Sequence, residues 1–229
     1  MADAAPSTTD ALFEEFMTRI RTGAWPVGGA IPSERKMMEE FGVSRIALRE
    51  ALSRLRALGV LEVSHGRSSR VRKLDMGVLG RLFPLLLSSE AQSSYQHVFQ
   101  VRLPIESQTA YLAALNRTDE DLAEIEALLA KLKKRKPRGG ASIIKRDLDL
   151  HLQIARASKN PLFPLLLEAL SQFVVSSQES SCGDDPERLA MAHRDHLAIA
   201  DAIRDRDPER ARAAMVAHLH ASASRVLRG

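Results

Sequence analysis

This chain of 229 residues contains a single cysteine, Cys182. One thiol cannot form an intramolecular disulfide, so the sequence excludes a disulfide-stapled secreted scaffold and fits a reducing compartment. Long apolar runs are also missing, because the longest cluster, around residues 82–87, is far too short to span a bilayer. Residues 1–9 are small and polar, without the apolar core of a signal peptide. We therefore expect a cytoplasmic protein with no membrane segment.

The chain also lacks a large excess of charge of one sign. Its net charge is only +4, so the total charge does not by itself indicate a nucleic-acid partner. The distribution of charge is more informative, because residues 31–73 contain ten basic residues and five acidic ones, a net charge of +5. This segment alone exceeds the net charge of the whole chain. A localised basic region is the electrostatic feature expected of a surface that contacts phosphates.

Residues 31–58 have the pattern of two short helices joined by a tight turn. Ser33 can accept hydrogen bonds from free backbone N–H groups at the start of the first helix, and Ser44 can do so for the second. Gly42 supplies the backbone freedom that a sharp turn between them needs. At helical spacing, the apolar stripe of the second helix is predicted to contain Ile46, Ala47, Leu48, Ala51, Leu52 and Leu55.

Three basic residues of the second helix, Arg45, Arg49 and Arg56, are left to point outward. A second helix with an arginine-rich first turn is what a helix-turn-helix protein inserts into the DNA major groove. A helical hairpin with a solvated basic face would show the same pattern, so these residues alone do not distinguish it from a DNA-binding helix-turn-helix. Residues 60–63 and 70–73 then indicate two short strands around a turn, which would form a wing.

The spacing of these residues resembles the winged helix-turn-helix of the GntR family of bacterial transcription regulators. The matching positions are Gly23, Trp25, Gly28, Pro32, Ser33, Glu34, Arg35, Phe41, Gly42, Val43, Ser44, Arg45, Leu48, Arg49, Glu50, Ala51, Leu52, Leu55, Gly59, Val60, Leu61 and Gly66. The wing departs from the family pattern, which usually has a glycine where Ser68 stands and an aromatic residue where Arg70 stands.

The resemblance implies a set of DNA contacts in this first region. Arg35, Arg45 and Arg49 would contact bases or phosphates. Ser33 and Ser44, with the helix N-termini behind them, would hold phosphates. A further DNA-binding residue implied by the resemblance is Gly66 of the wing.

The sequence predicts a mainly α protein with two domains. Residues 1–75 would form the winged helix-turn-helix, with residues 1–8 disordered, and residues 76–90 would be a connector packed against the second domain. From residue 91 onward every segment has a helical pattern, and no strand-like alternation occurs. Residues 91–229 are therefore predicted to form an all-α antiparallel bundle of six helices. Pro104 is expected to bend the first of them or to mark its first turns.

Four polar residues lie on apolar helix faces of this second domain. Asp147 and His151 are four residues apart, which places them close together on one face of a helix. His196 and His218 lie on the apolar stripes of the two last predicted helices. One carboxylate and three imidazoles that converge inside a bundle would form a site for a divalent transition metal.

Other interpretations of these four residues remain open from spacing alone. A single histidine on a helix is more often a satisfied or surface residue than a ligand, and no sequence spacing links the three helices. Asp147 could instead pair with Lys145 or Arg146, and Asp149 is an alternative carboxylate. The remaining histidines, His65, His97, His193 and His220, look ordinary.

The same stretches resemble the ligand-binding domain, called FCD, of the FadR-like branch of the GntR family. The matching positions are Asp147, Leu148, Asp149, Leu150, His151, Ala155, Ala157, Ser158, Asn160, His196, Ile199, Ala202, Ile203, Asp207, Ala211, Met215, Val216, Ala217, His218 and Leu219. The resemblance implies that Asp147, His151, His196 and His218 bind a divalent metal, with open positions for a carboxylate of a small organic acid. Zinc, nickel, manganese and iron would all suit this mixed ligand set.

Two further residues are implied to bind the effector. Arg102, followed by Ile105 and Glu106, matches the first helix of that domain, where the arginine faces the pocket. A guanidinium can hold a carboxylate through two parallel hydrogen bonds, although Arg102 could equally be a surface residue paired with Glu106. Asn160 is the second candidate, and it could instead cap the helix that follows Pro161.

These predictions combine into a transcription regulator, most simply a repressor, that senses a small organic acid. One DNA-binding domain contacts few base pairs, so we expect a homodimer on a pseudo-palindromic operator in double-stranded DNA. Two alternatives are kept open. The first is a helical-bundle metalloenzyme in which the metal activates water. The second is a regulator whose metal only stiffens the bundle.

Overall fold

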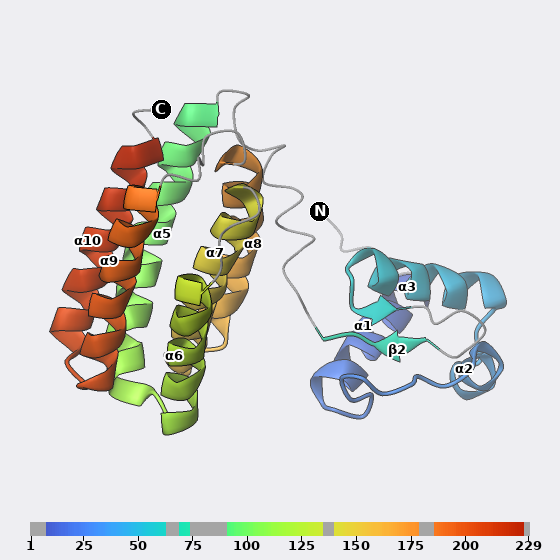
Figure 1. Cartoon of the computed structure of the whole chain (residues 1–229). Coiled ribbons are helices and arrows are strands. Elements are labelled where there is room, and N and C mark those ends of the chain that lie inside the picture. Colours follow the sequence, from blue (N-terminus) through green and yellow to red (C-terminus); the bar gives the residue numbers. More distant parts are fainter. Residues whose placement is uncertain (1–7, 63–68, 74–90, 135–139, 179–185, 227–229) are drawn as a thin grey trace, which may run out of the picture. The chain divides into compact units, whose positions relative to one another are not determined.

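The computed structural model describes residues 8–62, 69–73, 91–134, 140–178 and 186–226. The chain divides into two compact units, residues 1–78 and residues 79–229 (Figure 1). The predicted disordered residues 1–7, the wing residue Gly66 and the predicted connector over residues 76–90 lie outside the described residues.

The first unit is a winged helix-turn-helix. Its helices and strands are α1 (Thr8–Arg21), α2 (Glu34–Phe41), α3 (Arg45–Ala57), β1 (Leu61–Glu62) and β2 (Arg70–Val71). The two strands are antiparallel, with Leu61 opposite Val71. Phe16, Met37 and Leu52 lie almost completely buried in the core that the helices share with the strands. The helix α1 begins at Thr8, so the prediction that residue 8 is disordered was wrong, because the next residue, Thr9, is buried against this core.

Local hydrogen bonds fix the helix-turn-helix as the sequence predicts. The Ser33 hydroxyl oxygen accepts the backbone N–H of Lys36, and the Ser44 hydroxyl oxygen accepts that of Ala47. Gly42 ends α2 in the left-handed conformation, with φ of 61°, a value that residues with a Cβ rarely adopt. Its N–H donates to a carbonyl near the end of α2. The hydrogen bonds of Ser33, Gly42 and Ser44 therefore fix the start of α2, its end and the start of α3.

One residue of the predicted apolar stripe does not lie in the core. Leu48, Ala51, Leu52 and Leu55 are buried, whereas the Ile46 side chain is 81% exposed. Position 46 is nine residues from position 55, which at about 100° per residue is about 180° around the helix. Ile46 is therefore on the solvent side of α3, and its assignment to the stripe was wrong.

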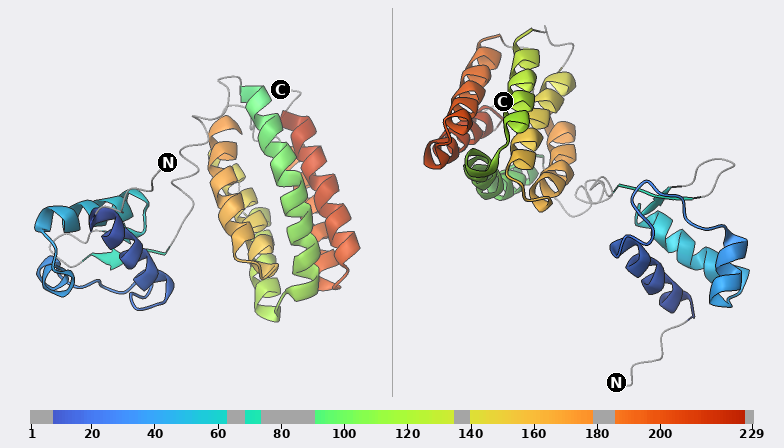
Figure 2. Two further views of the ribbon diagram at one scale, coloured as in Figure 1. Left: turned by 180° about the vertical axis from the view of Figure 1, so that it is seen from behind. Right: turned by 90° about the horizontal axis from the view of Figure 1, so that it is seen from below.

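The second unit is a bundle of helices whose axes run along roughly one direction (Figures 1 and 2). Its described helices are α5 (Ala91–Asn116), α6 (Asp119–Lys134), α7 (Gly140–Ala157), α8 (Leu162–Gln178), α9 (Pro186–Arg204) and α10 (Pro208–Val226). The helix α5 packs against α7, α8, α9 and α10, so it is the central helix of the unit. No described helix combines the length and the apolar character needed to cross a membrane.

Small residues allow these helices to approach closely. Ala110, Ala113 and Ala114 of α5 are fully buried, and they pack in one cluster with Ile199 of α9 and Met215 of α10. Alanine has the highest helix propensity and the smallest side chain that still buries apolar surface, so it suits a central helix with neighbours on several sides.

Side-chain hydrogen bonds mark the start of α6. Thr118 and Asp121 form a reciprocal capping box at the start of α6, in which each backbone N–H donates to the side chain of the other residue. Pro104 lies in the interior of α5, not in its first turns. The helix α8 continues to Gln178.

Candidate metal centre and DNA-binding surface

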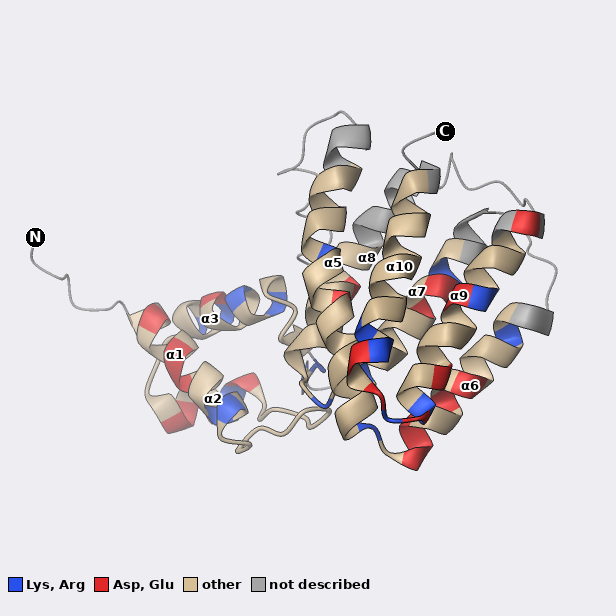
Figure 3. Cartoon of the chain, turned by 90° about the vertical axis from the view of Figure 1, so that its left-hand side faces the viewer, with Lys and Arg blue, Asp and Glu red and all other residues tan. Residues whose placement is uncertain are grey.

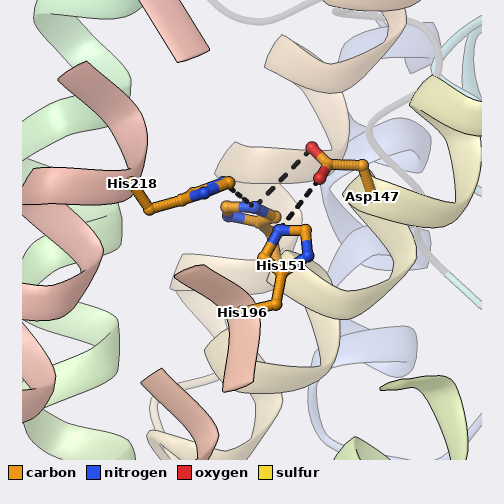
Figure 4. A group of neighbouring side chains, drawn as sticks. All are labelled: Asp147, His151, His196 and His218. Carbon is orange, nitrogen blue, oxygen red and sulfur yellow. Dashed lines mark hydrogen bonds and ion pairs between the residues drawn. The ribbon is translucent and has the colours of Figure 1, made fainter. Parts of the chain in front are cut away.

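Asp147, His151, His196 and His218 come together in the bundle. Each can offer one ligand atom, and these four atoms all lie within 4.8 Å of one another. Figure 4 shows the four side chains pointing toward a common point. The centroids of the three imidazole rings are 4.4, 5.1 and 5.7 Å apart.

Three helices position these side chains. Asp147 and His151 lie one turn apart on α7, while His196 comes from α9 and His218 from α10. The apolar stripe that buries each helix against the bundle also carries its histidine inward, so that the three histidines are only 2–3% exposed. The Asp147 side chain is 30% exposed and is the member of the cluster closest to solvent.

The distances within the cluster suit a shared cation as well as hydrogen bonds. His151 Nε2 lies 3.2 Å from His218 Nε2, and two nitrogen lone pairs at that distance repel unless a proton or a cation lies between them. His196 Nε2 lies 3.0 Å from Asp147 Oδ1. Even so, His196 Nε2 is a buried nitrogen with no hydrogen bond of acceptable geometry. Three imidazoles and one carboxylate are the ligands that divalent transition metals prefer, so this set fits such an ion.

A buried carboxylate that the sequence did not mark as functional supports the cluster. Glu106, only 1% exposed, contacts Nδ1 of His151 through one oxygen. A carboxylate only accepts hydrogen bonds, so His151 Nδ1 carries a hydrogen and Nε2 is the nitrogen that faces the cluster. The other oxygen of Glu106 accepts a hydrogen bond from Arg102 Nε. Arg102, Glu106 and His151 therefore form a continuous buried chain of contacts, which we call the Arg102–Glu106–His151 relay.

Electrostatics keep both carboxylates of the site ionised. Burial would raise the pKa of Glu106, but the charge of Arg102 and the contacts with His151 lower it to about 2. Burial would also raise the pKa of Asp147, but the close approach of His196 and the charges of the imidazoles lower it well below its usual value. The site thus holds two negative charges beside its imidazoles.

The pKa values of His151 and His218 are shifted in opposite directions. Burial would lower the pKa of His151, but the carboxylates of Glu106 and Asp147 raise it above its usual value. Burial lowers the pKa of His218 well below its usual value, and the neighbouring imidazoles add to this effect. His218 Nδ1 lies 3.6 Å from the Asp195 carboxylate, on the side away from the cluster. A neutral imidazole has the free lone pair that a metal requires.

The two predicted effector residues lie in different surroundings. Arg102 is 7% exposed and reaches the cluster through Glu106, so it is not the surface residue that the sequence allowed, and its effector role stays a prediction. Asn160 is exposed, and its side-chain oxygen accepts the N–H of Leu162 at the start of α8, as a helix cap would. Its other hydrogen bonds join it to Ser158 and Phe163. The structure does not bring Asn160 together with the four cluster residues, and its effector role stays a prediction.

The predicted DNA-binding arginines lie on the solvent side of α2 and α3. Arg35 donates to Glu39 at 2.8 Å, and Arg49 donates to Glu34 at 3.0 Å, with side chains 79% and 61% exposed. Arg45 is exposed and forms no ion pair among the residues that the structure describes. Figure 3 shows acidic and basic segments interleaved on both helices, in keeping with the ion pairs of Arg35 and Arg49.

Two family models match the chain. The model described as "Bacterial regulatory proteins, gntR family" matches residues 8–71, and the model described as "FCD domain" matches residues 97–221. The HTH-type transcriptional repressor NanR of Klebsiella aerogenes is 32% identical over 211 residues, covering 90% of this chain and 80% of the relative. NanR of Escherichia coli K12 is 30% identical over 212 residues, with the same two shares.

Solved structures support the fold. Streptococcus agalactiae GntR is similar with a TM-score of 0.77 at 24% identity, covering 95% of this chain and 97% of that one. Escherichia coli McbR/YncC is similar with a TM-score of 0.54 at 19% identity, covering 97% of this chain and 98% of that one. These similarities show that the two-unit architecture, a helix-turn-helix followed by a helical bundle, occurs in known proteins.

Proposed function

Because the chain belongs to the GntR family of bacterial regulatory proteins and carries an FCD domain, we propose that it is a repressor whose operator binding responds to a small carboxylate. The family and domain matches make it a transcription regulator and not an enzyme. The observation that carries the sensing part of the proposal is the convergence of four ligand atoms within 4.8 Å in the bundle, three of them on buried histidines.

The DNA-binding part of the proposal assigns roles to the first turns of α2 and α3. Arg45 and Arg49 enter the major groove with the N-terminal part of α3, while Arg35 contacts the backbone or a base from α2. The Ser33 and Ser44 hydroxyls accept a backbone N–H within the protein and can still donate their own hydrogens to phosphates. Two copies of the chain, related by a two-fold axis, would read a pseudo-palindromic operator.

Replacing Arg49 by alanine should weaken binding to a specific duplex by about 1–3 kcal/mol, because a bidentate arginine–guanine contact carries about that much discrimination. The duplex is one that the full chain selects from a random-sequence pool, and the affinity is measured by fluorescence anisotropy at fixed salt. Arg54→Ala is the matched control, because Arg54 lies on the same helix but pairs with Asp10 and Glu50. Unchanged affinity of the Arg49 variant, or an equal loss in the control, would exclude the base-reading role.

The sensing part of the proposal assigns the metal to Asp147, His151, His196 and His218. The ion would supply Lewis-acidic positions for the carboxylate oxygens of an effector. Arg102, the only buried arginine near the cluster among the described residues, would hold the effector with the nitrogens that Glu106 does not engage. Effector binding would shift α7 relative to α9 and α10, and the resulting change in the bundle would alter the spacing of the two DNA-binding units.

The test compares three states of the full-length protein on its selected duplex. Protein as purified, protein stripped by a chelator and protein reloaded with Zn²⁺, Ni²⁺ or Mn²⁺ are each titrated with a panel of small mono- and dicarboxylates. We expect at least one acid to reduce DNA affinity in the metal-loaded protein and to have no effect after stripping. If stripping lowers the melting temperature but no acid changes DNA affinity in any loaded state, the metal is structural and the sensing role is wrong.

A further inference from the structure

Ile46 is the most exposed large apolar side chain of the described residues, at 81%. It is the second residue of α3, the helix that a helix-turn-helix presents to DNA, and it lies two residues after the Ser44 cap. A scattered exposed apolar residue on a protein surface is ordinary. This one lies in the first turn of the recognition helix, where base edges are contacted, and that position calls for an explanation.

Folding does not account for an isoleucine at position 46. The side chain contributes almost nothing to the core, because it lies on the side of α3 opposite Leu48 and Leu55. A β-branched residue is also a poorer helix former than alanine, since its side chain loses rotamer freedom in a helix. Neither packing nor helix propensity therefore favours isoleucine here.

The neighbours of Ile46 point to the chemistry of its partner. Arg45 precedes it, and Arg49 lies one turn further on the same exposed side of α3. The other exposed large apolar residues that the structure describes in this unit are elsewhere, with Leu58 after the far end of α3 and Val27 before α2. A single apolar group between two arginines is too small a patch for an apolar protein partner. It matches the major groove, where apolar methyl groups stand beside hydrogen-bonding edges and phosphates.

We propose that Ile46 reads the C5-methyl group of a thymine in the major groove, between the contacts of Arg45 and Arg49. Thymine is the one standard base that presents a methyl group there, and an apolar side chain recognises it by excluding water from both groups. Ile46 is thus a specificity-determining residue, and this inference rests on the proposed insertion of α3 into the groove.

The test removes the methyl group from the DNA and its partner from the protein. Each thymine of the duplex selected by the full wild-type chain is replaced singly by deoxyuridine, which changes only the C5 substituent. We expect one position in each half-site where the replacement weakens binding about fourfold. Burying one methyl-sized group contributes ~0.8 kcal/mol, and a tenfold change in affinity corresponds to about 1.4 kcal/mol. Replacement in both half-sites together should cost about 15-fold.

The variant Ile46→Ala, measured on the same two duplexes, completes the comparison. Ile46→Ala should bind the thymine duplex more weakly than wild type and should bind the thymine and deoxyuridine duplexes equally. Leu58→Ala, which removes an exposed apolar side chain beyond the other end of α3, should keep the full difference between the two duplexes. Since Ile46 is on the surface, its variant should keep the wild-type melting temperature.

Two results would overturn the inference while leaving DNA binding intact. The first is a wild-type protein whose affinity is unchanged by every thymine-to-deoxyuridine replacement. The second is an Ile46→Ala variant that still distinguishes the two duplexes as wild type does. A wild-type chain that selects no sequence from the random pool would instead contradict the proposed DNA-binding function itself, and this inference with it.

Discussion

Replacing His196 and His218 together by alanine is expected to remove the bound metal from the purified protein. The two residues supply two of the four atoms that lie within 4.8 Å of one another, and the remaining pair, Asp147 and His151, comes from a single helix. Structural and catalytic sites of this type need at least three protein ligands to hold an ion firmly. Metal content measured by elemental analysis should fall from about one ion per chain to near zero.

A second pair of histidines provides a matched control. His193 lies on α9, three residues before His196, and His220 lies on α10, two residues after His218. His220 is exposed and packs its ring against Phe99 instead of the cluster. The His193→Ala, His220→Ala double variant should retain the metal content of wild type. Equal metal content in both double variants would mean that the ion is bound elsewhere.

The helix-turn-helix could be predicted from the sequence because its determinants are local. Ser33, Gly42 and Ser44 each act on backbone groups within four residues, so their hydrogen bonds follow from the order of residues alone. The error at Ile46 has an equally local cause. Being apolar and next to a stripe is not the same as lying on it, and angular position around the helix decides burial.

The metal cluster could be predicted only in part. Helical spacing placed Asp147 beside His151 and put His196 and His218 on inward faces, but nothing in the spacing shows that three helices bring them to one point. The family resemblance supplied that step. Convergence depends on how α7, α9 and α10 pack, and packing is set by contacts between residues far apart in the chain.

Glu106 was missed as a functional residue for a related reason. A glutamate four residues after an arginine is the usual pattern of a solvated helix pair, and Arg102 with Glu106 has that pattern. In the structure both are buried, and the carboxylate is shared with His151 of α7. The signal that could have marked it is the surrounding run of small buried residues on α5, Thr109, Ala110 and Ala113, which indicates a central helix.

Replacing Glu106 by leucine is expected to lower the free energy of unfolding by about 3–5 kcal/mol. The substitution leaves the guanidinium of Arg102 buried without its ion-pair partner, and breaking a buried ion pair by removing one partner costs about that much. Urea unfolding of the metal-free protein, followed by circular dichroism, measures the loss. A loss below about 1 kcal/mol, as for an exposed pair, would contradict the buried relay.

The double variant Arg102→Met, Glu106→Leu separates stability from the site. Two apolar side chains of similar volume leave no unpaired charge, so most of the lost stability should return. The metal site should not recover, because His151 Nδ1 still lacks the carboxylate that fixes its hydrogen and the direction of its ring. Loss of such an outer partner typically weakens metal binding 10–100-fold, as measured by competition with a chromogenic chelator.

The metal affinity of the double variant decides whether Glu106 positions His151 or only neutralises Arg102. If the double variant regains both stability and metal affinity, Glu106 serves only to neutralise Arg102, and the orientation of His151 is set by packing. If it regains stability but binds metal weakly, the carboxylate positions the ligand. Arg102→Met alone sharpens the comparison, because it keeps Glu106 against His151 while removing the guanidinium. That variant should retain metal binding better than the double variant, since the carboxylate that directs His151 Nε2 toward the cluster is still present.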